Sequence, residues 1–121
     1  MTVGSAHPAL MLIDEASFEE VVLGARAVAL VAFVIPGLRA TSEVLAALEP
    51  IATSGVEVLA FVVDVDGSPG LAKRYRVEDA PVVVVLSLGA EVGRLAGPRR
   101  PIEYQIALES AAAATSIRHA C

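Results

Sequence analysis

Few side chains in this 121-residue sequence are suited to covalent or metal chemistry. Cys121 is the only cysteine, so an intrachain disulfide is excluded, and an incidental thiol is the simplest interpretation of it. The two histidines, His7 and His119, lie near opposite ends, and no His-x-x-His or Cys-x-x-Cys spacing marks a metal site. No serine stands in the glycine-flanked elbow of a hydrolytic triad. The sequence therefore predicts neither a metal nor a cofactor.

Two charged motifs are further candidates for binding. The segment Asp64-Val65-Asp66-Gly67 resembles the start of a calcium loop, but the further acidic or amide residue and the later glutamate of such a loop are missing. We therefore expect a turn there. Arg99 and Arg100 stand at the start of a predicted helix, where basic side chains oppose the helix dipole, and they suggest a small docking patch.

The composition excludes several classes of function. The net charge is −5 and Lys73 is the only lysine, so no basic stripe is present and no nucleic-acid partner is expected. The longest apolar runs, 27–35 and 80–86, are too short to cross a membrane. Residues 1–8 lack the pattern of a signal peptide, so we expect a cytoplasmic protein with no membrane partner. The scarcity of lysines leaves strand edges poorly guarded, which allows a homodimer.

Hydrophobic patterning and turn signals predict one α/β domain at 9–114, between a flexible leader at 1–8 and a flexible tail at 115–121. Ser17 and Glu20 have the spacing of a capping box. The predicted elements, in order, are strand 9–13, helix 14–23, strand 27–35, helix 38–53, strand 56–63, helix 69–75, strand 82–86, strand 91–95 and helix 101–114.

Five features of these elements predict how they pack. The alternation of strands and helices predicts parallel strand pairs with helices on both faces, and the short turn at 88–90 predicts an antiparallel hairpin at one edge. The unbroken apolar run at 27–35 is typical of a central strand. Pro50 predicts a kink or an early end of its helix. In the last helix we expect Ile102, Ile106 and Leu108 to face the core.

This β-α-β-α-β-α-β-β-α order, with its spacings, resembles the thioredoxin family over about 9–114. Segment 14–22 is similar to the family's first helix, 30–33 to the strand before its active site, and 63–77 to the segment before its cis-proline. Pro81 stands where that proline belongs, and Gly89 and Gly97 stand where the hairpin and groove glycines belong. The resemblance implies a thioredoxin fold, with a mixed central sheet and helices on both faces.

The same resemblance implies that dithiol–disulfide exchange has been lost. The family's Trp-Cys-Gly-Pro-Cys motif corresponds to Gly37-Leu38-Arg39-Ala40-Thr41, so Leu38 replaces the nucleophilic cysteine and Thr41 the resolving one. The buried aspartate and the nearby lysine of the family correspond to Ala32 and Val62. Exchange requires a thiolate, and a threonine without a base is not activated. Four residues that serve one reaction are therefore absent together.

With disulfide exchange lost, the function that the resemblance still implies is the binding of a partner in a groove. The resemblance places a cis Ala80–Pro81 bond beside the degenerate motif positions, which are Leu38, Arg39, Ala40 and Thr41. Together they would border a surface that pairs with an extended protein or peptide. Such a protein would have a chaperone-like or assembly role. Three alternatives stay open: the groove residues have drifted after loss of function, Leu38 is packed inward, or the protein is an accessory thiol oxidoreductase that uses Cys121 or a partner's thiol. The predicted groove residues are Val34, Ile35, Gly37, Leu38, Ala80, Pro81 and Gly97.

Overall fold

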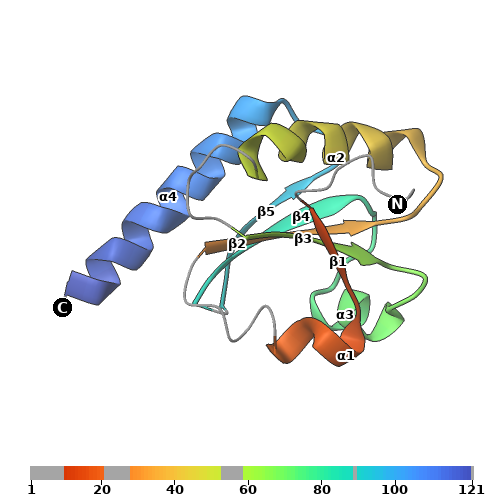
Figure 1. Ribbon diagram of the computed structural model, residues 1–121, viewed down its shortest axis with the longest axis horizontal. Coiled ribbons are helices and arrows are strands. Elements are labelled where there is room, and N and C mark those ends of the chain that lie inside the picture. The colour runs from red at the N-terminus through yellow and green to blue at the C-terminus, as the bar shows by residue number, and fades with distance from the viewer. Residues whose placement is uncertain (1–9, 21–27, 53–58, 89, 121) are drawn as a thin grey trace, which may run out of the picture.

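The computed structural model describes residues 10–20, 28–52, 59–88 and 90–120. Within them the chain forms a five-stranded sheet in the order β1-β3-β2-β4-β5, with α2 and α4 on one face and α1 and α3 on the other (Figure 1). The predicted α/β architecture, with a mixed sheet covered on both faces, is confirmed.

The strands are β1 (Met11–Ile13), β2 (Val28–Val34), β3 (Leu59–Asp64), β4 (Val82–Ser87) and β5 (Ala90–Ala96). β3 pairs in parallel with both β1 and β2, whereas β2–β4 and β4–β5 are antiparallel. β2 lies in the middle of the sheet and every one of its residues is buried, as its unbroken apolar run predicts. The predicted start of β3 at 56–58 lies outside the described residues.

The helices are α1 (Glu15–Phe18), α2 (Arg39–Ala52), α3 (Pro69–Arg74) and α4 (Pro101–Ala120). α2 continues past Pro50 to Ala52. The predicted end of the first helix, at 21–23, falls outside the part of the chain that the structure describes.

The capping prediction for α1 is wrong by one turn. The N-cap is Asp14, whose carboxylate accepts a hydrogen bond from the Ser17 N–H at 3.0 Å, while the Ser17 hydroxyl accepts one from the Asp14 N–H at 3.2 Å. Ser17 is therefore the N3 partner of a capping box, and not the cap of a box that it forms with Glu20.

The face that α4 buries also differs from the prediction. Leu108 is in the core, 2% exposed, but Ile102 and Ile106 are 51% and 56% exposed. Tyr104 and Ala111 are buried in their place, because positions 104, 108 and 111 follow the helical repeat along one face. The helix also continues to Ala120, beyond the predicted end at Ala114.

Two apolar clusters, one on each face, hold the sheet to its helices. One contains alternate residues of β2 together with Val44, Leu48 and Leu108 from α2 and α4. The other contains the remaining β2 residues with Phe18 and Leu71 from α1 and α3. In the described parts of the chain, no helix is both long enough and apolar enough to cross a membrane.

The sheet edges are formed by β1 and β5. β1 has three residues, and the pairing of β5 with β4 shifts register between Val85 and Leu86, as at a β-bulge. Short and bulged edge strands resist pairing with another chain. Self-association therefore stays a prediction from the composition, with no support from these edges.

Candidate functional site

The sheet register gathers the predicted groove segments at one end of the molecule. Phe33 pairs with Val82, and Val82 pairs with Ala96. The residues that follow β2, precede β4 and follow β5 are consequently neighbours. A hydrogen bond from the Gly97 N–H to the Pro81 carbonyl, at 2.9 Å, joins two of these segments.

Leu38 stands immediately before α2. Its carbonyl accepts hydrogen bonds from the N–H groups of Thr41 and Ser42 at 3.1 and 3.3 Å, so it begins the helical ladder. Gly37, with φ of +91°, makes the bend that precedes it, a conformation in which glycine avoids steric cost. The Leu38 side chain is 42% exposed. The alternative in which Leu38 packs inward is therefore wrong.

Thr41 has the opposite placement. It is 6% exposed, and its hydroxyl donates a 2.7 Å hydrogen bond to the carbonyl of Ile35. This bond ties the first turn of α2 back to the end of β2. The hydroxyl proton is held by a carbonyl rather than by a base, so nothing in this contact activates the oxygen as a nucleophile.

The interior at the remaining family positions is apolar. Ala32 and Val62 are register partners in β2 and β3, and they are 0% and 8% exposed. Both belong to the cluster that contains Val44 of α2. The structure therefore brings together the two positions that the resemblance paired, and neither carries a group that can hold a proton.

The Ala80–Pro81 peptide bond is cis, as predicted. Pro81 is buried, whereas Ala80 is half-buried. Among the described residues, neither the N–H nor the C=O of Ala80 has a hydrogen-bond partner. The backbone of Ala80 thus offers one donor and one acceptor at the end of the sheet.

Two of the predicted groove residues cannot present their side chains to a partner. Val34 is 3% exposed and belongs to the core, because the last residue of β2 still faces α2 and α4. Pro81 is buried and shapes the turn without forming its surface. Exposed or half-exposed positions remain at Ile35, Gly37, Leu38, Ala80 and Gly97.

Tyr104 holds the Gly97 segment in place. It is fully buried, its hydroxyl donates to the Gly97 carbonyl at 3.3 Å, and it accepts from the Arg99 N–H at 3.1 Å. Burial raises the pKa of the Tyr104 hydroxyl. Tyr104 was not identified in the sequence analysis. The available signal was that it is the only Phe, Trp or Tyr residue of α4.

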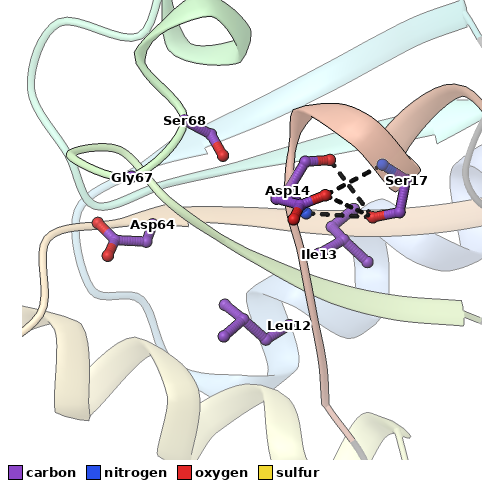
Figure 2. A pocket seen from close by; sticks show the side chains of 7 residues that line it. All are labelled: Leu12, Ile13, Asp14, Ser17, Asp64, Gly67 and Ser68. Atoms are coloured by element: carbon purple, nitrogen blue, oxygen red, sulfur yellow. Dashed lines mark hydrogen bonds between the residues drawn. The ribbon is translucent and has the colours of Figure 1, made fainter.

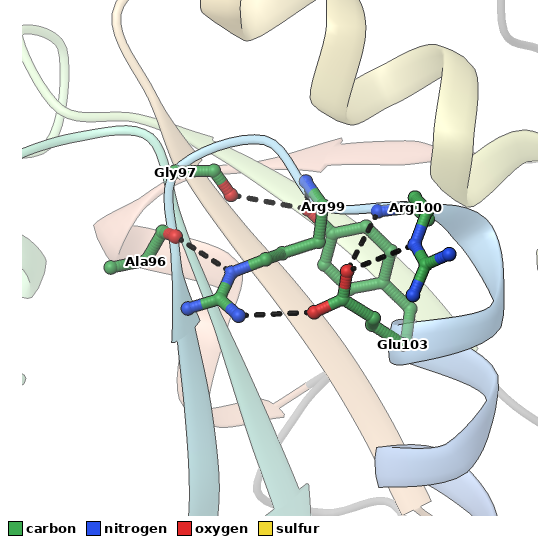
Figure 3. Close-up of polar contacts among 6 residues, drawn as sticks. Ala96, Gly97, Arg99, Arg100 and Glu103 are labelled. Atoms are coloured by element: carbon green, nitrogen blue, oxygen red, sulfur yellow. Dashed lines mark hydrogen bonds and ion pairs between the residues drawn. The ribbon is translucent and has the colours of Figure 1, made fainter.

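The predicted Arg99–Arg100 patch is largely engaged within the chain. Arg99 pairs with Glu103 at 3.0 Å and donates to the Ala96 carbonyl at 3.1 Å, and Arg100 pairs more loosely with Glu103 at 3.5 Å (Figure 3). The hydrogen bonds from Arg99 and Arg100 lower the pKa of the Glu103 carboxyl. Arg100, with a side chain 81% exposed, is the more available of the two.

Among the described residues, the remaining sequence candidates form no metal site. The 64–67 segment is a turn, as predicted: the Asp64 carbonyl accepts from the N–H groups of Gly67 and Ser68. No group of three histidine, cysteine, aspartate or glutamate side chains that could hold a metal occurs among the residues the structure describes. His7 and Cys121 lie outside those residues, and the side chain of His119 is not described.

The sequence matches no protein-family model and no curated protein. Solved structures do match. A point mutant of the thioredoxin from Halobacterium salinarum NRC-1 superposes with a TM-score of 0.78 at 21% identity, covering 90% of this chain and 96% of its own. The chain has the thioredoxin fold. Malassezia sympodialis thioredoxin (Mala s 13) matches at a TM-score of 0.74 and 21% identity, over 85% of this chain and 90% of its own.

A third match comes from a structural study of the thiol-resolving mechanism in yeast mitochondrial 1-Cys peroxiredoxin via the glutathione and thioredoxin systems. Its TM-score is 0.76 at 18% identity, over 88% of this chain and 99% of that one. These identities establish the thioredoxin fold and not an activity. Since the sequence has one cysteine, this thioredoxin-fold chain has no Cys-x-x-Cys motif.

Proposed function

We propose that this thioredoxin-fold protein is inactive in dithiol–disulfide exchange and binds an extended protein or peptide segment, in a chaperone-like or assembly role. The observation that carries the proposal is the placement of Leu38. This leucine is exposed at the start of α2, where the sequence resemblance places the family's nucleophile. It offers apolar contact area where the family has a thiol.

The neighbouring backbone supports the same function. The unpartnered N–H and C=O of Ala80, as far as the described residues go, could pair with one residue of an extended segment, as in strand addition. Main-chain pairing at Ala80 would give affinity with little dependence on sequence. Contact with Leu38 would then select apolar side chains in the partner.

The proposal is tested by screening the purified protein against an array of peptides and measuring the binders by fluorescence anisotropy. We expect the binders to carry an apolar residue and Leu38→Asp to weaken them by about tenfold or more, because a carboxylate would be desolvated against that residue. Leu88→Asp is the matched control. Leu88 is 38% exposed at the β4–β5 turn, at the other end of the sheet, so this variant should bind normally.

Failure would take one of two forms. Wild-type protein that binds no peptide in the array would contradict the proposed groove. Equal losses in Leu38→Asp and Leu88→Asp would show that added negative charge, and not the Leu38 surface, is responsible.

A further inference from the structure

A concave site lies at the same end of the sheet as the predicted groove residues, beyond β3. It is a hollow of about 220 Å³ at the ends of β1 and β3, lined by Leu12, Ile13, Asp14, Asp64 and Ser68 among others (Figure 2). Neither the fold resemblance nor the groove accounts for it. Its walls come from three segments that the parallel pairing of Ile13 with Val63 brings together.

Ser68 gives this hollow an unused polar group. The residue is 2% exposed, and its side chain makes no capping bond to α3. In the described structure its hydroxyl has no hydrogen-bond partner at all. Figure 2 shows the hydroxyl directed toward the space between Asp14 and Asp64. The hydroxyl oxygen keeps some contact with solvent, so water binds it in the free protein and a ligand in the hollow can take that place.

The two aspartates supply negative charge with spare acceptor capacity. In Asp14 the Oδ1 atom accepts from Ser17, and in Asp64 the Oδ1 atom accepts from the Asp66 N–H at 2.9 Å. Neither Oδ2 atom has a hydrogen-bond partner in the described part of the chain. The hydrogen bonds from Ser17 also lower the pKa of the Asp14 carboxyl, which keeps it ionised. Among the described residues, no lysine or arginine lines the hollow.

The two helix N-termini near the hollow do not turn it into an anion site. Asp14 accepts the Ser17 N–H of α1, and the Glu15 carboxylate accepts the Gly70 N–H of α3 at 2.5 Å. Each of these short helices therefore already has a carboxylate of the chain itself at its N-terminus. The charge that the lining of the hollow presents to a ligand is therefore negative.

Size and lining narrow the ligand further. Sites for drug-sized molecules have volumes of roughly 300 to 1,000 Å³, so this smaller hollow suits a single side chain or a small amine. Leu12, 70% exposed, and Ile13 give it an apolar wall. An ammonium group has three N–H donors, and the lining offers acceptor oxygens on Asp14, Asp64 and Ser68.

We propose that this hollow binds a primary alkylammonium group, the chemistry of a lysine side chain, with its aliphatic stem against Leu12 and its nitrogen on Asp14, Asp64 and Ser68. The source is either a lysine of a partner chain or a free alkylamine. The site uses none of the groove residues, so a test that rejects this proposal would not reject the proposed peptide binding, and the reverse also holds.

The test is a titration followed by ¹H–¹⁵N NMR. We expect Nα-acetyl-lysine N-methylamide to shift the amide signals of Gly67 and Ser68 with millimolar affinity, and the norleucine analogue, which lacks the ammonium group, to leave them in place. n-Butylammonium distinguishes the sources. Equal binding of n-butylammonium indicates a free amine as the ligand, and much weaker binding indicates a lysine held in a chain.

Three variants make the assignment specific. Asp64→Asn should weaken binding by about tenfold and Ser68→Ala by about threefold, as expected for a charged and a neutral hydrogen bond. Ser68→Ala removes no described hydrogen bond, so the fold should be retained. Asp66→Asn is the control, because Asp66 is exposed in the same turn but does not line the hollow. Binding of the norleucine analogue as tight as that of the lysine probe, or equal losses in Asp64→Asn and Asp66→Asn, would overturn the proposal.

Discussion

Leu38 and Thr41 stand three residues apart at the start of α2, and their side chains have opposite roles. Leu38 is 42% exposed and available to a partner, while Thr41 is 6% exposed and bonded to the Ile35 carbonyl. The spacing that places two sulfur atoms side by side in a Cys-x-x-Cys motif here separates an exposed side chain from a buried one. The Thr41 bond fixes the loop in which Leu38 is presented.

Thr41→Val tests this structural role. The substitution keeps the shape of the side chain but leaves the Ile35 carbonyl without its partner, so we expect the free energy of unfolding to fall by about 1–2 kcal/mol. Urea denaturation followed by circular dichroism measures it. Ser42→Ala, at the exposed neighbouring position, is the control and should change stability by less than about 0.5 kcal/mol. Equal stability of Thr41→Val and wild type would contradict the role of this bond.

The tyrosines predict how stability depends on alkaline pH. Burial raises the pKa of Tyr104 and of Tyr75 above the ordinary 10.0, so the folded state holds these protons more tightly than the unfolded state does. Their contribution to stability is therefore complete below pH 10 and is lost as the pH rises through the raised values. We expect the free energy of unfolding, measured in urea from about pH 9 to about pH 11, to decline.

Tyr104→Phe separates this effect from other alkaline titrations. The variant should be less stable than wild type near neutral pH, because the Gly97 carbonyl and the Arg99 N–H lose their shared partner. Its stability should then decline less steeply above pH 10, with Tyr75 still contributing. A decline as steep as that of wild type would show that Tyr104 does not titrate in this range.

Among the elements, β2 and α4 mark the limits of prediction from sequence. β2 was predictable because a strand buried on both faces leaves an unbroken apolar run, and no other pattern competes with it. In α4, by contrast, isoleucines and alanines occupy several faces, so periodicity alone did not select the buried one. The buried face of its first turn is fixed by Tyr104, whose hydroxyl donates a hydrogen bond to the Gly97 carbonyl. This is a tertiary contact, and a local sequence pattern does not indicate it.

The face that α4 buries can be tested with one pair of substitutions. Leu108→Ala removes a side chain 2% exposed and should lower the free energy of unfolding by about 2–4 kcal/mol, from lost burial and the cavity left behind. Ile106→Ala, at a residue 56% exposed, should lower it by less than about 1 kcal/mol. Chemical denaturation of both variants in parallel is the measurement. Similar losses would mean that Ile106 is also packed, as the sequence predicted.

The candidate sites differ in how far the sequence could reveal them. Leu38, Pro81 and Gly97 were predictable from family spacing, and the structure brings their segments together. The alkylammonium hollow was not predictable. Asp14 and Asp64 are far apart in the chain and meet only because β1 pairs with β3, and the burial of Ser68 depends on the packing of the segment that enters α3.

At the scale of the whole molecule, strand direction concentrates the candidate sites at one end. β1, β2 and β3 run parallel, so Asp14, Ile35 and Asp64 all follow the carboxyl ends of their strands. A hydrogen bond of 2.9 Å from the Val65 N–H to the Val34 carbonyl links the loop on the groove side to the loop on the hollow side. This end of the sheet therefore carries an exposed apolar residue, Leu38, and a polar hollow.

This arrangement predicts that the chain fails to catalyse disulfide reduction, and that installing two cysteines is enough to begin it. The wild-type protein should show no insulin reduction above the dithiothreitol background, because Leu38 offers no thiolate. Leu38→Cys combined with Thr41→Cys, in a Cys121→Ser background, should gain turnover, since position 38 is exposed at a helix N-terminus, where a thiolate is stabilised. The Cys121→Ser single variant is the control. Wild-type activity that this control abolishes would contradict redox inactivity and assign the chemistry to Cys121.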